Sequence, residues 1–287
     1  MKSNLILANP TSGRGRGARV LAETMEYLER NRLRYQVIAS SSLAQSLNEF
    51  SQIPLSECER VLVVGGDGMI HHAINALAKN TESAVPVGIV PAGTGNDFAR
   101  ALGLDVKRPS KNLDLFLSSE SKAVDLGEVN GTRFGAICST GFDSIVNERA
   151  NGMHWPQGRR KYDLAMLQEL PRFKPRRYRI TIDDRVREVQ AMLIAVGNGS
   201  SYRGGMKVCP EANLHDGLLD VMILNPVPKF EFLRIFPKVY SGSHSSHPQL
   251  EVILGREIHI EGEAIERLYQ AVDQGVDGVV MNPAGFL

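Results

Sequence analysis

The sequence predicts an α/β domain, with a parallel sheet covered by helices on both faces, followed by a second domain of the β-sandwich type. Its 287 residues are enough for two ordinary domains. Up to about Leu102, short apolar runs alternate with segments of helical periodicity, the pattern of a helix-covered parallel sheet. From about Val124 onward, short β-rich runs separated by turns predominate. We therefore expect domains over residues 1–125 and 126–287.

Strands and helices are expected to alternate in the first domain. The strands are predicted at Leu5–Ala8, Tyr35–Ala39, Arg60–Val64 and Val87–Val90. Apolar residues at helical spacing predict the helices that follow these strands. Their apolar positions are Leu21, Met25 and Leu28, then Leu43, Leu47 and Phe50, then Ile70, Ile74 and Leu77, and finally Phe98–Leu102.

The second domain is expected to consist mainly of short strands that form two packed layers. These strands are predicted at Arg133–Cys138, Arg179–Asp183, Val189–Val196, Leu218–Leu224, Leu250–Leu254, Glu257–Glu261 and Leu268–Asp273. Two helical interruptions are predicted as well, around Tyr162–Leu170 and around Lys229–Tyr240.

Composition excludes several classes of protein. The hydrophobic share of 43% and charged share of 23% are typical of a soluble globular chain rather than a disordered or collagen-like one. The formal net charge of +1 argues against extensive wrapping by nucleic acid, so no nucleic-acid partner is expected. The longest apolar run, near Ala191–Val196, falls far short of the roughly 20 residues of a membrane-spanning helix. Leu5–Ala8 is too short for a signal-peptide core.

The cysteines and histidines give no metal or disulfide signal. Cys58, Cys138 and Cys209 are odd in number and far apart, so neither a disulfide framework nor a CxxC zinc site is expected. His244 and His247 have H-x-x-H spacing but no nearby cysteine or glutamate, and a polar loop is the favoured interpretation. Together these observations predict a protein of a reducing compartment, the cytoplasm.

Three turns that follow strands carry the residue types of a phosphate site. Ligands of parallel α/β sheets bind outside the carboxyl ends of the strands, where the turns after the first, third and fourth strands all lie. Glycines let the backbone approach an anion closely, and helix N-termini direct N–H groups at the same place. This combination suits a nucleoside triphosphate, and the carboxylate of Asp67 suits Mg²⁺ held against its phosphates. The turns are Asn9-Pro10-Thr11-Ser12-Gly13, Gly65-Gly66-Asp67-Gly68 and Gly93-Thr94-Gly95-Asn96-Asp97.

These turns have two other interpretations. A Gly-Gly-Asp-Gly sequence after a strand can be only a tight βα connection. Gly13, Gly15 and Ala18 loosely fit the dinucleotide pattern G-x-G-x-x-G/A, but the second strand ends at Ala39-Ser40 without an acid for a ribose. No P-loop motif G-x-x-x-x-G-K-[ST] occurs. The convergence of three such turns favours a phosphate site.

The three turns resemble the signature segments of the diacylglycerol kinase catalytic domain, which is shared with sphingosine and ceramide kinases and, more distantly, with NAD kinases. The third segment, Pro91–Arg100, is the most specific, whereas Gly-Gly-Asp-Gly also occurs in NAD kinases and phosphofructokinases. The resemblance continues through Gly141-Phe142-Asp143, Asn198-Gly199 and Asp216-Gly217-Leu218-Leu219-Asp220. It implies an ATP-binding α/β domain, a β-sandwich lipid-binding domain and a nucleotide in the cleft between them.

The resemblance also implies site residues. For a structural Mg²⁺ in the second domain it implies Asp216 together with the main-chain carbonyls of Asn213 and Leu218. Catalytic roles fall to Asp67 and to an acid near the C-terminus. The residues expected at ATP are Asn9, Pro10, Thr11, Ser12, Gly13, Ser40 or Ser41, Gly65, Gly66, Asp67, Gly68, Met69, His72, Gly93, Thr94, Gly95 and Asn96.

The sequence departs from the family pattern at two places. Met69 and His72 stand where the family usually has Thr and Glu, and His72 is a candidate substitute contact to phosphate, with affinity falling as pH rises. Asp273-Gln274-Gly275 stands where the family commonly reads Asp-Gly-Glu, whose Glu is the general base. Three explanations are open: Asp273 is the base, Glu263 or Asp277 takes its place, or the protein binds nucleotide and lipid without efficient turnover.

A basic segment offers a means of reaching a membrane. Residues 159–179 contain eight basic side chains against two acidic ones, and Trp155 lies just before them. Such an excess binds anionic lipid surfaces, and tryptophan is common at headgroup level. The alternative is a solvated basic face beside a core tryptophan.

The resemblance therefore implies an ATP-dependent lipid kinase that transfers the γ-phosphoryl group of ATP to the hydroxyl of diacylglycerol or a related lipid alcohol. We expect it in the cytoplasm, peripherally associated with the inner membrane face, and a homodimer is left open. Two alternatives remain: a soluble-substrate kinase such as an NAD kinase, and a catalytically silent binding protein.

Overall fold

The chain divides into two compact units, Met1–Val124 and Asp125–Ala284. The computed structural model describes residues 2–40, 42–79, 85–156, 159–262 and 278–284.

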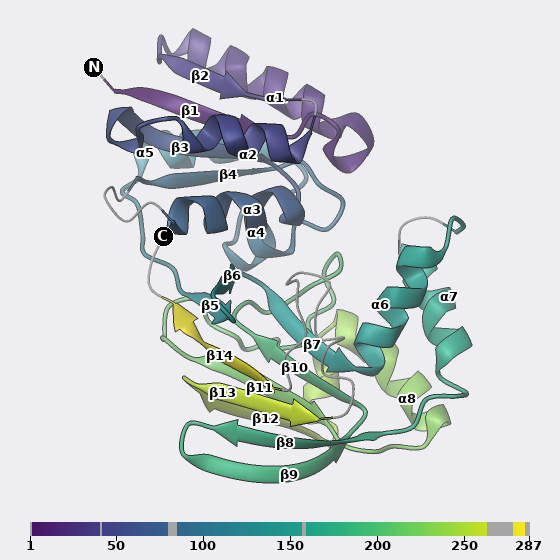
Figure 1. The fold of residues 1–287 in the computed structure, drawn as a ribbon. Helices are drawn as coiled ribbons and strands as arrows, with labels where there is room; N and C mark the ends of the chain where they lie inside the picture. The colour runs from purple at the N-terminus through teal and green to yellow at the C-terminus, as the bar shows by residue number, and fades with distance from the viewer. Residues whose placement is uncertain (1, 41, 80–84, 157–158, 263–277, 285–287) are drawn as a thin grey trace. The chain divides into compact units, whose positions relative to one another are not determined.

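The first unit contains a four-stranded parallel sheet with the order β2-β1-β3-β4. Helices cover both of its faces, α1 and α5 on one and α2 and α3 on the other (Figure 1). The strands are β1 (Ser3–Ala8), β2 (Tyr35–Ile38), β3 (Cys58–Gly65) and β4 (Val87–Pro91). The helices are α1 (Ser12–Arg30), α2 (Leu43–Ser51), α3 (Asp67–Ala78), α4 (Asp97–Ala101) and α5 (Asn112–Ser118), with short 3-10 helices at Leu55–Glu57 and Pro109–Lys111. The predicted α/β class and all four predicted strands are confirmed.

Burial on both faces explains the unbroken apolar runs of β1 and β3. Ile6 and Leu62 pack against Val20 of α1 and Leu113 of α5 in one buried cluster. The intervening residues of the same strands are equally buried on the opposite face. A strand enclosed in this way reads as a continuous apolar segment rather than an alternating one. Helix α5 was not predicted.

The second unit is built on two antiparallel sheets that pack face to face. One has six strands in the order β6-β5-β14-β13-β8-β9, and the other has four in the order β12-β11-β10-β7. Ile180 and Ile260 of the first sheet share a buried cluster with Ile194 and Val221 of the second. The predicted β-sandwich class is therefore confirmed. The strands are β5 (Leu126–Val129), β6 (Thr132–Phe134), β7 (Ile137–Gly141), β8 (Arg176–Ile182), β9 (Arg185–Ala191), β10 (Leu193–Gly197), β11 (Leu219–Leu224), β12 (Leu250–Gly255), β13 (Ile258–Gly262) and β14 (Gly278–Ala284).

Helices cover the outer face of the four-stranded sheet (Figure 1). They are α6 (Phe142–Gly152), α7 (Arg159–Glu169) and α8 (Lys229–Ile235), with 3-10 helices at Phe236–Tyr240 and Ser243–Ser246. Phe142, Met166 and Phe232 from these helices form a second buried cluster with Met192 and Met222 from the sheet side. The four-stranded sheet is thus enclosed on both faces, and every residue of β11 is buried.

Several predicted strands of the second unit have different bounds. The single strand expected at Arg133–Cys138 is two strands, β6 and β7, separated at Gly135-Ala136. The strand expected at Val189–Val196 is also wrong: the chain leaves the six-stranded sheet after β9 and enters the four-stranded sheet at β10. Both residues flanking Met192 are apolar, so the crossing between layers leaves no break in the pattern.

Other elements were missed or fall outside the described residues. Helix α6 and the strands β5 and β14 were not predicted, and the strand expected at Leu268–Asp273 lies outside the described residues. The helix expected at Tyr162–Leu170 is confirmed as α7. The one expected at Lys229–Tyr240 is α8, continued by a 3-10 helix with a proline near its start.

Candidate active site

The turns after β1, β3 and β4 lie side by side at one edge of the parallel sheet. The Asn9 backbone N–H donates to the Val64 carbonyl at 3.0 Å, and the Ala92 N–H donates to the Gly65 carbonyl at 2.7 Å. These bonds extend the strand pairing beyond the last residues of the ladders. The convergence predicted from the sequence is therefore present in the structure.

Two glycines allow the second and third turns to touch. A Cβ added to Gly93 would lie 2.4 Å from the Cα of Gly66, and one added to Gly66 would lie 2.9 Å from the Cα of Gly93. Neither distance is compatible with a side chain, so both glycines are required by the packing of the turns. Gly68 differs from them, because nothing described lies within 4 Å of its added Cβ and the residue is exposed.

The first turn has a left-handed backbone. Gly13, Arg14 and Gly15 have φ values of 57°, 62° and 88°. A Cβ on Gly13 would lie 2.2 Å from the Ala92 carbonyl oxygen, so this glycine is also needed for packing against the third turn. The Asn9 side-chain oxygen accepts bonds from the Thr11 N–H at 3.0 Å and the Thr11 hydroxyl at 2.8 Å, which fixes the start of the loop.

Asp67 joins the second turn to the third. Its carboxylate accepts the backbone N–H of Asn96 at 2.6 Å, of Asp97 at 2.7 Å and of Phe98 at 3.3 Å. A carboxylate offers about four acceptor positions, and backbone N–H groups occupy three of those of Asp67. Asp67 thus holds the start of α4 in place, a role that the sequence did not predict. Its predicted contact with Mg²⁺ stays a prediction.

Asn96 shapes the third turn from within. Its side-chain oxygen accepts the Gly93 N–H at 2.8 Å, and its amide donates to the Gly93 carbonyl at 2.9 Å. The side chain is buried and the backbone is left-handed, with φ of 58°. Because Asn96 is committed to Gly93, the groups of this turn that remain open to solvent are those of the exposed Thr94 and half-buried Gly95.

The start of α3 supplies backbone donors rather than side chains. The first N–H groups of a helix have no intrahelical acceptor, and the first intrahelical bond here runs from Ile70 to Gly66 at 3.1 Å. Met69 is 5% exposed and packs beside Gly65, so its side chain belongs to the core. Any contribution of Met69 to ligand binding would come from its backbone N–H.

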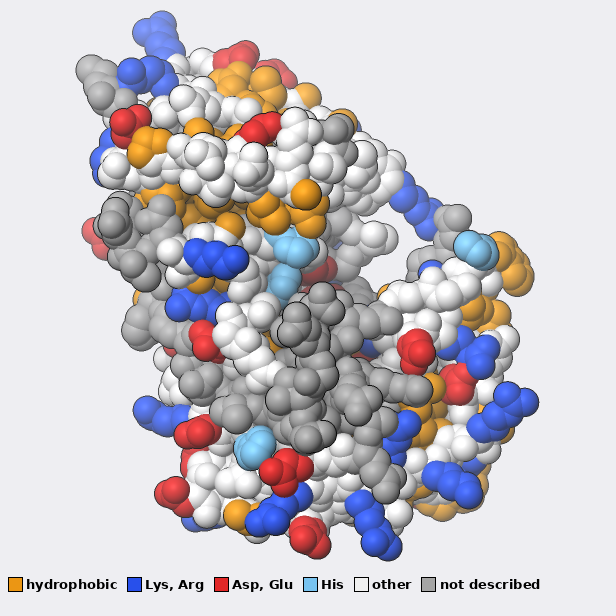
Figure 2. Space-filling view, in the orientation of Figure 1, with side chains coloured by type: hydrophobic (Ala, Val, Ile, Leu, Met, Phe, Trp, Pro, Cys, Tyr) orange, Lys and Arg blue, Asp and Glu red, His pale blue; other side chains and the backbone are white. Residues whose placement is uncertain are grey.

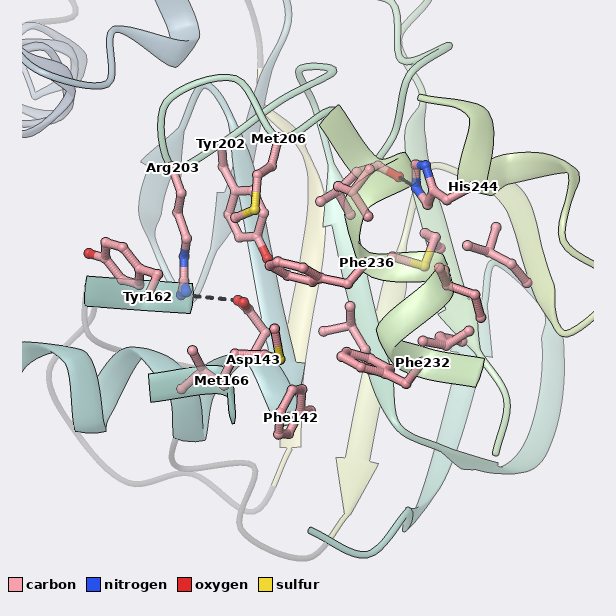
Figure 3. A pocket seen from close by; sticks show the side chains of 18 residues that line it. Phe142, Asp143, Tyr162, Met166, Tyr202, Arg203, Met206, Phe232, Phe236 and His244 are labelled. Carbon is pink, nitrogen blue, oxygen red and sulfur yellow. Dashed lines mark hydrogen bonds and ion pairs between the residues drawn. The ribbon is translucent and has the colours of Figure 1, made fainter. Parts of the chain in front are cut away.

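The second unit contains an apolar pocket between the outer face of its four-stranded sheet and the helices that cover it. Its walls include Phe142 and Val146 of α6, Met166 of α7, Met222 of β11 and Phe232 of α8. Figure 3 shows these side chains from close by, with Phe236 between the two sides of the pocket. This arrangement suits a hydrocarbon chain.

One buried ion pair lies in the wall of this pocket. The Arg203 guanidinium Nη2 lies 3.1 Å from Oδ2 of Asp143, and their side chains are 14% and 10% exposed. The Ser139 hydroxyl donates to the same carboxylate oxygen. The guanidinium also lies 5.0 Å from the ring centroids of both Tyr162 and Tyr202. In Figure 3, Arg203 and Asp143 face each other at one side of the pocket, and His244 lies at the other.

Burial perturbs the titration of the groups around this pair. Burial, followed by the negative charge of Asp143, raises the pKa of Tyr202 well above its ordinary value. Burial lowers the pKa of the Arg203 guanidinium, but Asp143 and the two tyrosines outweigh it, and the net shift is upward. At neutral pH Arg203 is therefore a guanidinium cation and Tyr202 a neutral phenol.

Comparisons with known proteins bear on both units. The diacylglycerol kinase catalytic domain matches residues 3–129, and the YegS C-terminal NAD kinase beta sandwich-like domain matches residues 136–285. A diacylglycerol kinase of Mycobacterium tuberculosis is 34% identical over 261 residues, which cover 89% of this chain and 84% of the relative. The chain belongs to the diacylglycerol kinase family.

Two further relatives agree with this assignment. A diacylglycerol kinase of Bacillus subtilis is 29% identical over 245 residues, which cover 85% of this chain and 80% of the relative. The crystal structure of a diacylglycerol kinase from Bacillus anthracis matches 98% of this chain and 93% of its own with a TM-score of 0.73 and 22% identity, which shows the shared fold. The diacylglycerol kinase family is one of lipid kinases, and its kinase activity implies ATP as the phosphoryl donor.

The segment that the diacylglycerol kinase resemblance assigns to Mg²⁺ is a tight acidic loop. Asp216 Oδ1 accepts the Leu218 N–H at 3.0 Å, and Asp125 Oδ2 accepts the Gly217 N–H at 2.7 Å. Burial, and then the charges of Asp216 and Glu211, raise the pKa of Asp220 to about 6. Acidic side chains gathered in this way create a negative potential that a divalent cation would relieve, so the donor set fits Mg²⁺. The described residues contain no cluster of three or more His, Cys, Asp or Glu that could hold a metal.

The remaining residues implied by the diacylglycerol kinase pattern are Ser40 or Ser41, His72 and the candidates for the general base. Ser40 is half-buried and its N–H donates to the Ser46 hydroxyl at 3.3 Å, whereas Ser41 lies outside the described residues. His72 is half-buried next to His71, with ring centroids 5.3 Å apart. Burial lowers the pKa of both imidazoles, and His72 lowers that of His71 further. The three candidates for the general base, Asp273, Glu263 and Asp277, all lie outside the described residues.

The basic segment of this chain, residues 159–179, is only partly exposed to solvent. Arg160, Arg172, Lys174, Arg177 and Arg179 are exposed, whereas Arg176 is half-buried with one nitrogen inside the protein. Figure 2 shows basic and hydrophobic side chains mixed over the helical side of the second unit. Trp155 is 79% exposed, which excludes the alternative of a core tryptophan. Among the helices that the structure describes, none is long and apolar enough to span a bilayer.

Sequence reasoning missed the pocket. The sequence indicates Asp143 only through the family resemblance, and no motif marks Arg203. The i, i+4, i+8 spacing of Phe142, Val146 and Ala150 was the available signal for α6 and was overlooked. The polar-loop interpretation of His244 is wrong, because its side chain is buried against the pocket and its Nε2 lies 3.1 Å from the Val208 carbonyl oxygen.

Proposed function

We propose that this member of the diacylglycerol kinase family is an ATP-dependent lipid kinase that transfers the γ-phosphoryl group of ATP to the hydroxyl of diacylglycerol or a related lipid alcohol. The observation that carries the proposal is the apolar pocket of the second unit, with the buried ion pair of Asp143 and Arg203 in its wall. A hydrocarbon chain fits the wall of Phe142, Met166 and Phe232, and a hydroxylated head fits the polar side. A pyridine dinucleotide, the substrate of an NAD kinase, is polar throughout and matches such a wall poorly.

The nucleotide would bind at the three turns of the first unit. Backbone N–H groups at the start of α3 and in the left-handed Gly13–Gly15 segment would contact the phosphates, with Thr94 exposed beside them. Asp67 and Asn96 would position these turns rather than contact ATP themselves. Asp216 and the carbonyls of Asn213 and Leu218 would hold a structural Mg²⁺ in the second unit. Asp67 remains the candidate for the Mg²⁺ that neutralises the phosphates of ATP.

The reaction needs few protein groups, because phosphoryl transfer depends mainly on positioning and charge stabilisation. The lipid hydroxyl oxygen forms a bond to the γ-phosphorus while the bond from that phosphorus to the β–γ bridging oxygen breaks, and ADP leaves. The hydroxyl proton passes to a carboxylate, for which Asp273 is our first candidate and Glu263 and Asp277 are the alternatives. Loss of such a base lowers rates by roughly 10² to 10⁴-fold.

The substrate is a membrane lipid, so the protein would bind an anionic bilayer surface from the cytoplasmic side. The exposed Trp155 and the basic segment 159–179 support this proposal, as does Phe230, which is 61% exposed on α8 next to Arg234. Charge reversal at Arg160, Arg172 and Lys174 should reduce co-sedimentation with anionic vesicles, whereas vesicles of neutral lipid should bind neither form. Unchanged co-sedimentation would exclude this segment as the docking surface. A homodimer stays a prediction.

A product assay tests the main proposal. The protein would be incubated with labelled ATP, Mg²⁺ and, in parallel, micelles of diacylglycerol, of sphingosine and of ceramide, or soluble NAD. We expect a labelled lipid and no labelled NAD phosphate. Asp273→Asn, Glu263→Gln and Asp277→Asn should then identify the base, since one of the three should lose most of the turnover. ATP binding without product from any acceptor would favour the silent binding protein.

A further inference from the structure

The charged side chains in the described wall of the apolar pocket are Asp143 and Arg203, and they are bonded to each other. They come from different parts of the second unit: Asp143 is in the first turn of α6, and Arg203 is in the loop between β10 and β11. The wall therefore carries no net charge from this pair. A ligand that enters the pocket meets a neutral dipole instead of an isolated charge.

Several contacts commit the carboxylate of Asp143 to this arrangement. Its Oδ2 accepts the Ser139 hydroxyl and lies 3.1 Å from the Arg203 guanidinium. Asp143 also sits near the N-terminus of an 11-residue helix, where a negative charge is favoured by the helix dipole. Separating the pair inside the protein would leave an uncompensated buried charge, which is strongly unfavourable.

Other contacts hold Arg203 in place. Its backbone is left-handed, with φ of 52°, a conformation that a non-glycine residue adopts only when the surrounding structure requires it. The guanidinium lies over the rings of Tyr162 and Tyr202, both at 5.0 Å, a geometry of favourable cation–π contact. The cation is thus fixed beside Asp143 and is not free to swing away for an incoming ligand.

We propose that the Arg203–Asp143 pair selects the charge of the lipid head group, so that the pocket accepts uncharged glycerol-type lipids and excludes long-chain amines. An ammonium head would need a carboxylate of its own in this buried setting, and the one nearby is already neutralised by a guanidinium that would repel the newcomer. A hydroxyl and ester carbonyls have no such requirement. They can donate to Asp143 and accept from the remaining N–H groups of Arg203. This inference rests on the proposed lipid kinase function and narrows its substrate class.

Three matched eight-carbon ligands test the inference without catalysis. Calorimetry would compare 1-octanol, octylamine and octanoate, which share a chain and differ in head-group charge, for the parent, Arg203→Gln and Arg203→Lys. Arg203→Gln leaves Asp143 unpaired, so octylamine affinity relative to octanol should rise about tenfold or more. Arg203→Lys keeps the cation and should leave this ratio within about twofold. An unchanged ratio in a folded Arg203→Gln variant would overturn the proposal.

Two further variants keep the inference testable if Arg203→Gln fails to fold. The double variant Asp143→Asn, Arg203→Gln replaces the ion pair with two uncharged amides and should still disfavour octylamine. Asp143→Asn alone leaves the guanidinium unpaired and should raise the relative affinity of octanoate about tenfold or more. Equal octylamine gains in the double variant and in Arg203→Gln, or no gain for octanoate in Asp143→Asn, would each contradict a role for the pair in charge selection.

A kinase assay relates the binding result to turnover. The ratio of sphingosine to diacylglycerol phosphorylation should rise about tenfold or more in Arg203→Gln and not in Arg203→Lys. No phosphorylation of any lipid by the parent would contradict the proposed function. The calorimetric affinity ratios would still decide whether Arg203 and Asp143 select ligands by the charge of the head group. Conversely, diacylglycerol phosphorylation with unchanged ratios in all variants would leave the lipid kinase standing and remove only the inference about Arg203 and Asp143.

Discussion

The carboxylate of Asp67 accepts the backbone N–H of Asn96 at 2.6 Å, although 29 residues separate them along the chain. This bond ties the turn after β3 to the turn after β4, and Asn96 in turn holds Gly93 through two bonds of its side chain. The shape of the proposed phosphate site therefore depends on a small network in which one acid serves three backbone donors.

Replacing Asp67 with Asn should weaken both the first unit and its nucleotide binding. The variant swaps one acceptor oxygen for an N–H₂ group that faces backbone donors, so we expect a loss of about 1–3 kcal/mol in the free energy of unfolding. Loosening the third turn should lower affinity for an ATP analogue about tenfold or more. Urea unfolding and calorimetry would measure the two effects. Glu120→Gln, at an exposed acid of the same unit, is the control, and an Asp67→Asn variant that behaved like it would contradict the network.

Two glycine substitutions should separate packing from ligand contact. An alanine at Gly93 would place its Cβ 2.4 Å from the Cα of Gly66 and should cost about 1–3 kcal/mol of stability through overpacking. An alanine at Gly68 meets nothing within 4 Å and should leave stability unchanged or raise it by up to about 1 kcal/mol. If phosphates approach the start of α3, Gly68→Ala should nevertheless reduce nucleotide affinity. Full affinity in this variant would argue against an approach of ligand at that point.

Nucleotide affinity should be insensitive to the charge of His72 near neutral pH. Burial lowers the pKa of this imidazole below its ordinary value of 6.5, so the ring is neutral at about pH 7 and above. The predicted decline in affinity with rising pH is therefore confined to acidic solution. Affinities of the parent and His72→Gln should agree within about twofold at pH 7 to 8 and diverge only below about pH 6.5. A difference that persisted to about pH 8 would contradict this assignment.

The free energy of unfolding should depend on the charge of Asp220. Its pKa in the folded protein is raised from 3.8 to about 6, so the fold favours the protonated acid. That stabilisation is complete below about pH 4 and is lost as the pH rises through about 6. Without divalent cations, Asp220→Asn should be more stable than the parent at about pH 8, by about 1–3 kcal/mol, and equal to it at about pH 4. Equal stability at both pH values would contradict the shift.

Mg²⁺ should stabilise the folded parent protein at about pH 8. If Asp216 helps to hold the ion, Mg²⁺ should raise the melting temperature of the parent at about pH 8, and Asp216→Asn should abolish that gain. Removing the ion with a chelator should reverse it. A parent that melts identically with and without Mg²⁺ would count against the Asp216 loop as a cation site.

Local sequence patterns predicted the four strands of the first unit and the turns that follow them, but not the pocket of the second unit. The strands β1, β3 and β4 end in glycine-rich turns, and a parallel sheet necessarily brings such turns to one edge. The wall of the pocket instead contains an ion pair between Asp143 and Arg203, which lies 60 positions further along the chain. No periodicity in the sequence predicts this contact. The same limitation explains why the change of sheets at Met192 was not predicted: the chain passes from one sheet to the other within an unbroken apolar run.

The role of Asp67 shows a second limit. A carboxylate within a glycine turn has the same appearance in sequence whether it binds a cation or caps the start of another helix. Only the positions of the Asn96, Asp97 and Phe98 N–H groups distinguish the two. Residue type predicted that the glycine turns converge, and the backbone of a distant segment determines which groups Asp67 contacts.

The place of β14 in its sheet has a consequence for synthesis on the ribosome. This strand, Gly278–Ala284, inserts between β5 and β13, so the hairpin of β5 and β6 has no partner on its inner edge until residue 284 has emerged. The first unit can acquire its native pairing as soon as residues to Val124 are free, whereas the six-stranded sheet must wait. A nascent chain stalled before β14 would present open strand edges to other chains, and chaperone dependence or aggregation should begin at that length.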